Sequence, residues 1–137
     1  MLKIQSRLLL LVGLLLISTN IFSQDPKFYI YLCFGQSNME GAGTIENVDK
    51  TVDSRFKVME TVDCSNLGKT KGKWYTAVPP LTRCWTGLSP VDYFGRTMIA
   101  NLPSDIKVGV INVSVGGCKI ELFDKVNYTS YLSTVTE

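Results

Sequence analysis

The chain has 137 residues, of which 14 are Lys or Arg and 12 are Asp or Glu, and it contains no histidine. A nearly balanced charge without a basic stripe excludes nucleic acid as a partner, because nucleic-acid binding requires neutralisation of phosphates. The absence of histidine, together with four cysteines that form no C-x-x-C pair, argues against a bound metal such as zinc.

The first 23 residues have the three parts of a secretory signal peptide. Two basic residues precede an apolar run from Leu8 to Ile17, and small and polar residues follow up to Ser23. A spanning helix needs about 20 apolar residues, so the short run favours cleavage over a retained signal anchor, which is the alternative. We predict a signal peptide at residues 1–23 and a secreted or periplasmic protein, with no stable membrane span after cleavage.

A strand and a serine come next. The apolar run from Phe28 to Phe34 stops at Gly35, and Ser37 follows among small and polar residues. Such continuous runs are typical of strands buried on both faces of a parallel sheet. We predict that this strand delivers Ser37, exposed and outside any helix, to an open cleft, where its hydroxyl and nearby backbone N–H groups suit acyl transfer. A turn that merely ends the strand is the alternative.

The long segment from Asn38 to Pro80 is rich in Gly, Asp, Asn and Lys, which is typical of loops that surround a site in α/β enzymes. Within it, Arg55 to Glu60 indicates a short strand. Cys64 and Cys84 lie in polar, loop-like surroundings and are the better candidates for a disulfide, whereas the other two cysteines could be buried thiols. Spacing alone does not establish the bridge.

A helix and a second long strand follow. Pro90 to Asn101 carries apolar residues at helical spacing, and Ser89 is a candidate N-cap. Lys107 to Val113 is another continuous apolar run, and Gly116 and Gly117 come shortly after it. Paired glycines let a chain leave a strand at positive φ without any ligand. In open α/β sheets, however, ligands bind at the carboxyl ends of strands, where the serine also lies.

Three sequence segments match segments of a known family and occur in the same order as in that family. They are Gly35-Gln-Ser-Asn-Met39, the stretch from Trp74 to Met98, and the strand that ends in Asn-x-x-x-Gly-Gly. They resemble the SGNH esterases, specifically the sialate O-acetylesterase-like and acetylxylan esterase branch (carbohydrate esterase family six). The resemblance implies an α/β fold, a three-layer α/β/α SGNH-hydrolase-like parallel sheet.

The same resemblance assigns roles to individual residues. It implies that Ser37 is the nucleophile and that its N–H, with that of Gly116 or Gly117, forms the oxyanion hole. It further implies an acetylated carbohydrate as the substrate and neither a metal nor an organic cofactor. Oligomeric state is not indicated by the sequence.

The family pattern also includes a Gln-Gly-Glu block and an Asp-x-x-His block that supplies the base, and neither occurs here. We expect residues 24–137 to be the N-terminal part of an SGNH-type carbohydrate esterase domain, incomplete at its C-terminus and inactive alone. The predicted function is a serine esterase that removes O-acetyl groups from a carbohydrate, of acetylxylan or sialate O-acetylesterase type. The alternative is a catalytically inactive carbohydrate-binding or truncated product of the same fold, in which Trp74, Tyr75 and Trp85 stack on sugars.

Overall fold

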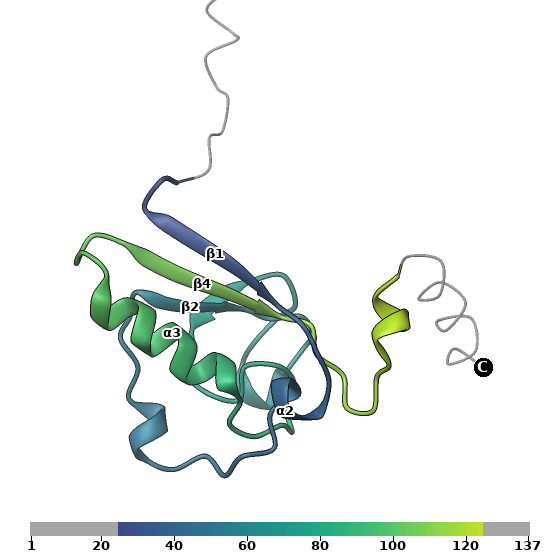
Figure 1. Ribbon diagram of the computed structural model, residues 1–137. Coiled ribbons are helices and arrows are strands. Elements are labelled where there is room, and N and C mark those ends of the chain that lie inside the picture. Colours follow the sequence, from purple (N-terminus) through teal and green to yellow (C-terminus); the bar gives the residue numbers. More distant parts are fainter. Residues whose placement is uncertain (1–24, 125–137) are drawn as a thin grey trace, which may run out of the picture.

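The computed structural model describes residues 25–124, which build one four-stranded sheet (Figure 1). Its order is β1-β4-β2-β3, in which β1, β4 and β2 are parallel and β3 pairs antiparallel with β2. The predicted α/β class is confirmed, while the expected parallel sheet is mixed because of its short last strand. The strands are β1 (Phe28–Cys33), β2 (Phe56–Met59), β3 (Trp74–Thr76) and β4 (Lys107–Asn112).

Two α-helices and two short 3-10 turns lie between the strands, and a third 3-10 turn follows β4. The longer helix, α3 (Pro90–Asn101), has the predicted bounds and begins with a capping box. In this box Ser89 N–H donates to Asp92 Oδ2 at 2.8 Å, and burial raises the pKa of the Asp92 carboxyl. The other elements are α2 (Ser37–Glu40), η1 (Val48–Lys50), η2 (Ser65–Leu67) and η3 (Ile120–Phe123).

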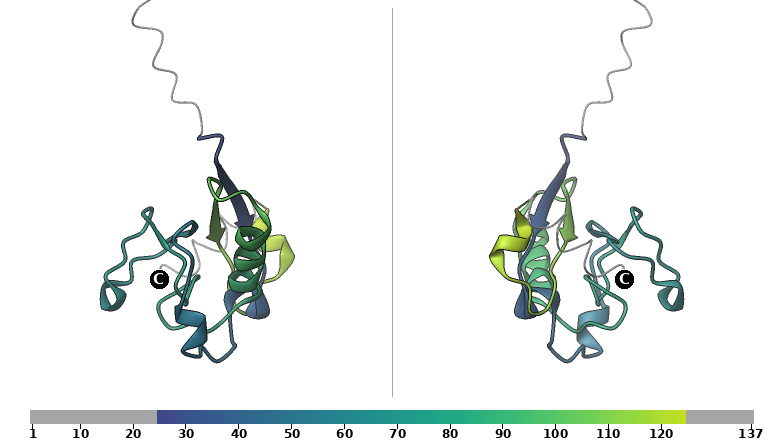
Figure 2. Two further views of the ribbon diagram at one scale, coloured as in Figure 1. Left: turned by 90° about the vertical axis from the view of Figure 1, so that its left-hand side faces the viewer. Right: turned by 90° about the vertical axis from the view of Figure 1, so that its right-hand side faces the viewer.

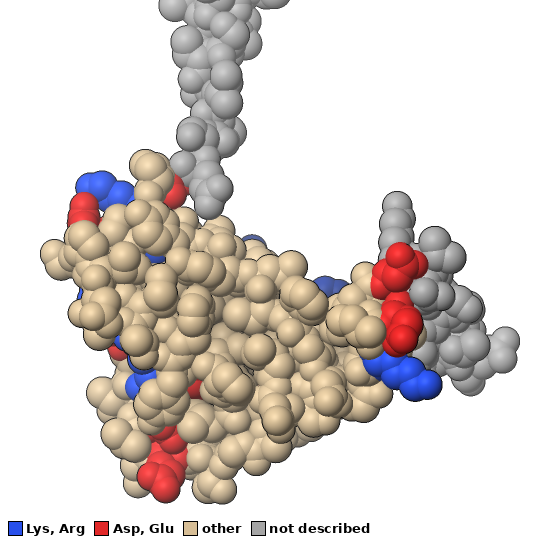
Figure 3. Space-filling view, viewed as in Figure 1, with Lys and Arg blue, Asp and Glu red and all other residues tan. Residues whose placement is uncertain are grey.

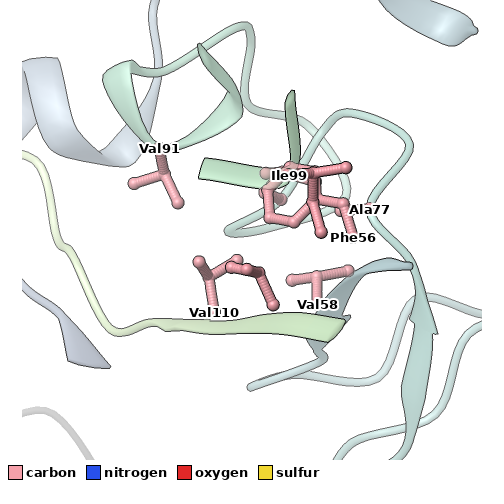
Figure 4. Packing of buried hydrophobic residues seen from close by; sticks show 8 residues of the cluster. Phe56, Val58, Ala77, Val91, Ile99 and Val110 are labelled. Carbon is pink, nitrogen blue, oxygen red and sulfur yellow. The ribbon is translucent and has the colours of Figure 1, made fainter. Parts of the chain in front are cut away.

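The core lies between α3 and one face of the sheet, as Figure 4 shows. Val91 of α3 points toward Val110 of β4, and Phe56 of β2 is fully buried beneath the helix. Gly95 allows this close approach, since a Cβ at that position would lie 2.0 Å from the Phe56 ring. The predicted short strand at 55–60 is therefore β2, an internal strand of the sheet that contributes to the core.

The loop between α2 and β2 is fastened to α3. Tyr93 donates its hydroxyl hydrogen to Asp49 Oδ1 at 2.8 Å, and Arg96 donates to the backbone oxygens of Asp49 and Thr51. Hydrogen bonds from the Glu46 N–H and from Tyr93 lower the pKa of the buried Asp49 carboxyl, and the same carboxylate raises the pKa of Tyr93. This part of the predicted long loop is thus held by specific contacts.

A buried ion pair holds the segment that contains β3. Lys69 Nζ lies 2.7 Å from Glu60 Oε1, and the two side chains are 11% and 2% exposed. The same ammonium donates to the carbonyl oxygens of Val78 and Pro80 at 3.3 and 3.4 Å. Figure 2 shows this segment at the end of the sheet away from β1.

Strand β1 is an edge strand of the described sheet and is less buried than predicted. Tyr31 packs against Phe94 of α3 at 5.1 Å between ring centroids. On the opposite face of β1, Ile30 and Leu32 are 41% and 63% exposed. In the view of Figure 3, with α3 toward the viewer as in Figure 1, the charged side chains lie around the margins of the molecule and the middle is uncharged. The expectation that both faces of β1 are buried is wrong for residues 25–124.

The predicted signal peptide at residues 1–23 lies outside the described residues. Within residues 25–124, neither α-helix has the length and apolar character needed to cross a membrane.

Candidate active site

Ser37 lies four residues after the end of β1, at the carboxyl edge of the sheet, and its side chain is exposed. It is the first residue of α2, a single helical turn, so the expectation that it would lie outside a helix is wrong. Its hydroxyl donates to Gln36 Oε1 at 3.2 Å. The hydroxyl is thus accessible and contacts an amide oxygen, which is too weak a base to activate it.

The chain after β4 continues to pair with the chain after β1, beyond the ends of both strands. Val113 N–H donates to Cys33 O at 2.9 Å, and Val115 N–H donates to Gly35 O at 3.2 Å. The residue after Val115 is Gly116, the first of the two glycines. The register of β1 and β4 therefore brings the glycine turn beside the serine turn, as the sequence predicted from two strand ends.

The two glycines occupy the middle of a four-residue turn that Cys118 N–H closes by donating to Val115 O at 3.1 Å. Gly117 has φ +74°, a conformation that favours glycine at the third position of a turn. Gly116 N–H donates to Glu40 Oε2 at 2.7 Å and is therefore occupied. For Gly117 N–H, residues 25–124 provide no hydrogen-bond acceptor. Of the two glycine N–H groups, the one at Gly117 is thus unpaired within residues 25–124.

Glu40 joins three segments at the site. Besides accepting from Gly116, its carboxylate lies 3.5 Å from Arg83 Nε, measured at Oε1. Glu40 ends α2, Gly116 follows β4, and Arg83 lies beside Cys84 in the loop between β3 and α3. One partly buried carboxylate thus fixes the glycine turn and the loop against the serine helix.

Asn112, the last residue of β4, is fully buried and connects the same three segments. Its amide nitrogen donates to Met39 O at 2.8 Å and to Thr82 Oγ1 at 2.7 Å, and its amide oxygen accepts from Ser114 Oγ at 2.6 Å. Both N–H groups of this amide donate hydrogen bonds, and one of the two lone pairs on its oxygen accepts one. The network sets the orientation of α2 relative to β4 without touching Ser37.

Cys64 and Cys84 form a disulfide with an S–S distance of 2.05 Å, the pair favoured from the sequence. The bridge ties the start of η2 to the residue after Arg83. Cys33 and Cys118 are free and half-buried, and burial raises the pKa of the Cys33 thiol. A raised pKa is the opposite of the lowered pKa that marks a reactive cysteine, so Cys33 is not a candidate nucleophile.

A cavity of about 520 Å³ lies between the glycine turn after β4 and η3. Arg83, Ser114 and both glycines line it, and Ser37 is not among its lining residues. This cavity is therefore not the open cleft expected in front of Ser37. Within those residues there is also no cluster of three or more His, Cys, Asp or Glu that could hold a metal ion.

The fold and this site define an α/β protein with an exposed serine and a glycine turn at neighbouring parallel strand ends. The sequence model of the family described as carbohydrate esterase, sialic acid-specific acetylesterase, matches residues 27–137. The chain belongs to this family, which confirms the resemblance noted in the sequence.

A solved structure supports the same fold. The crystal structure of a protein from Arabidopsis thaliana superposes with a TM-score of 0.57 at 18% sequence identity. The match covers 82% of this chain and 51% of the Arabidopsis protein, so the chain spans about half the length of that protein.

Sequence reasoning missed the residues that hold the site together. Glu40 and Arg83 gave no separate signal, because their partners are distant in sequence. Asn112 stood in the matched Asn-x-x-x-Gly-Gly pattern, which could have indicated a specific role. Its buried amide shows that this role is the positioning of α2 and the loop.

Proposed function

We propose that this chain carries the nucleophile and oxyanion hole of a serine esterase that removes O-acetyl groups from a carbohydrate. The observation that carries the proposal is the pairing of the two strand ends, in which Val115 N–H bonds Gly35 O and places the glycine turn beside Ser37. The family match supports ester hydrolysis on a carbohydrate in general. Removal of acetyl from sialic acid or from xylan is the finer form of the proposal.

In this proposal the Ser37 oxygen attacks the acetyl carbonyl carbon while a base takes the serine proton. The bond between that carbon and the sugar oxygen breaks as the tetrahedral intermediate collapses, and the sugar leaves as its alcohol after taking that proton from the base. The N–H groups of Ser37 and Gly117 bind the oxyanion, and each such donor is worth on the order of 3 kcal/mol of transition-state stabilisation. Water then releases acetate from the acyl-serine. No step requires a metal or an organic cofactor.

The proton on Ser37 needs a base, and the hydroxyl bonds only Gln36 among the described side chains. The 137 residues contain no histidine, so an imidazole base has to come from polypeptide other than these residues. We accordingly expect residues 24–137 alone to hydrolyse an aryl acetate no faster than their Ser37→Ala variant. Members of a triad act as a unit, and a serine without its base confers little.

The test compares residues 24–137 with the full-length product of the gene, each as wild type and as Ser37→Ala. Acetate release from O-acetylated xylan and from 9-O-acetylated sialic acid is measured. We expect activity in the full-length product, loss of that activity in its Ser37→Ala variant, and none in the short polypeptide. Carbohydrate binding without Ser37-dependent hydrolysis in the full-length product would support the second candidate, a non-catalytic sugar-binding protein.

A further inference from the structure

We propose that Trp85 is a stacking platform for a pyranose ring beside the serine turn, so that it binds the sugar whose acetyl group is removed. The inference rests on the proposed function for the nature of the ligand. Among the exposed large apolar side chains of residues 25–124, Trp85 has the highest exposed fraction, 73%. A large indole that stays in water at a rigid position is typical of binding sites.

The other two aromatic candidates are used by the fold. Trp74 packs edge-on against Phe28, with 4.9 Å between ring centroids, and lies so close to Gly109 that a Cβ there would be 2.8 Å from the indole. Tyr75 is half-buried against the core, and its hydroxyl accepts from Thr70 N–H at 3.0 Å. Trp85 therefore remains as the aromatic residue of the three with a free ring face.

The backbone that carries Trp85 is held firmly. Trp85 is the third residue of a turn in which Thr86 N–H and Thr86 Oγ1 both donate to Arg83 O, at 3.1 and 2.9 Å. The preceding residue, Cys84, is fixed by its disulfide to Cys64. A side chain on such a turn loses little conformational freedom when a ligand binds, because the backbone is already ordered.

One face of the indole is already occupied. The guanidinium carbon of Arg83 lies 5.8 Å from the ring centroid of Trp85, which is within cation–π range. Arg83 is in turn paired with Glu40, so the orientation of the indole is coupled to the serine helix. The 73% exposure leaves the opposite ring face open to solvent.

The turn is also joined directly to the segment that follows Ser37. Gly87 N–H donates to Gly41 O at 2.8 Å, and Gly43 and Leu88 exchange two hydrogen bonds at 2.8 and 3.0 Å. Trp85 thus lies two residues before Gly87, whose hydrogen-bond partner Gly41 lies four residues after the proposed nucleophile. A pyranose ring offers a face of C–H groups, which the indole can cover while the ring hydroxyls at the rim stay in water.

The test is a titration of the full-length gene product with xylotetraose and with the methyl glycoside of N-acetylneuraminic acid. Binding is followed by tryptophan fluorescence and by calorimetry, in the wild type and in the Trp85→Ala, Trp85→Phe and Tyr29→Ala variants. Tyr29→Ala removes another exposed aromatic ring, 40% exposed and at the opposite end of β1 from Ser37. Urea unfolding midpoints verify that the Trp85 variants fold.

We expect at least one glycan to bind, with an affinity that Trp85→Ala lowers by about tenfold or more, in line with ring stacking on aromatic side chains elsewhere. Trp85→Phe should lose less, and Tyr29→Ala should bind like the wild type. Failure of both glycans to bind, or equal affinity in Trp85→Ala and wild type, would overturn the proposal. Glycan binding requires no ester hydrolysis, so the titration and the hydrolysis assay can fail independently. The first failure would overturn the role of Trp85, and the second would overturn the esterase function.

Discussion

Replacing Asn112 by aspartate should destabilise the protein, because the Asn112 amide holds together the three segments that meet at the site. The change is isosteric, but it substitutes an oxygen for the amide nitrogen that donates to Met39 O and Thr82 Oγ1. Each lost hydrogen bond costs about 1 kcal/mol, and a buried carboxylate facing the Met39 carbonyl adds at least another 1 kcal/mol. We therefore expect a loss of about 3 kcal/mol in the free energy of unfolding.

The assay is urea denaturation followed by circular dichroism. With an m-value of about 1.5 kcal/mol per M of urea, the midpoint of Asn112→Asp should fall by about 2 M. Asn47→Asp is the matched control, since Asn47 is exposed and the same substitution there should change stability by less than about 0.5 kcal/mol. Equal midpoints for Asn112→Asp and the control would refute the assignment of Asn112 as a buried connector.

Three further changes probe other contacts. Replacing both cysteines of the Cys64–Cys84 disulfide by serine should lower the free energy of unfolding by about 3 kcal/mol, given the sequence separation of 20; an unchanged urea midpoint would contradict this. Glu40→Ala should accelerate hydrogen exchange at the Gly116 amide, whereas Glu40→Gln keeps an acceptor and should retain protection; NMR exchange rates that do not separate the two variants would argue against the contact. Asp49→Asn should lower the raised pKa of Tyr93 toward its ordinary value of about 10, as NMR of labelled tyrosine reports, and an unmoved pKa would contradict the pairing.

The lowered pKa of Asp49 also predicts a pH dependence of stability. A carboxyl whose pKa is lower in the folded than in the unfolded state stabilises the fold above its unfolded value, about 3.9. That contribution disappears as the pH falls through the folded value. Below about pH 4 the wild type should therefore lose stability more steeply than Asp49→Asn, whose side chain does not titrate.

The elements with strong local signals could be predicted from sequence. The helix at Pro90–Asn101 was predicted with its bounds, because a capping serine, a proline at the first position and helical spacing all agree. Strands β1 and β4 were each predicted within one residue from continuous apolar runs. The antiparallel β3 was missed, since its three residues form a strand only by pairing with β2.

The site was predictable in part. Ser37 and the glycine turn could be proposed from sequence because each follows an apolar run that ends abruptly, and the structure brings the two segments together. The one-turn helix at Ser37 was not foreseen, since Gly-Gln-Ser-Asn also favours turns. The choice between Gly116 and Gly117 could not be made from sequence, because it depends on a carboxylate 76 residues away that occupies the Gly116 N–H.

We propose that Ser37 is the nucleophile of a carbohydrate O-acetylesterase. Its most direct test is acetate release from O-acetylated carbohydrate by the full-length gene product, compared between the wild type and Ser37→Ala. We predict a loss of at least about 10³-fold in the variant, because the serine and its base act as a unit. Acetate release that persists at the wild-type rate in Ser37→Ala would contradict the assignment of Ser37 as the nucleophile.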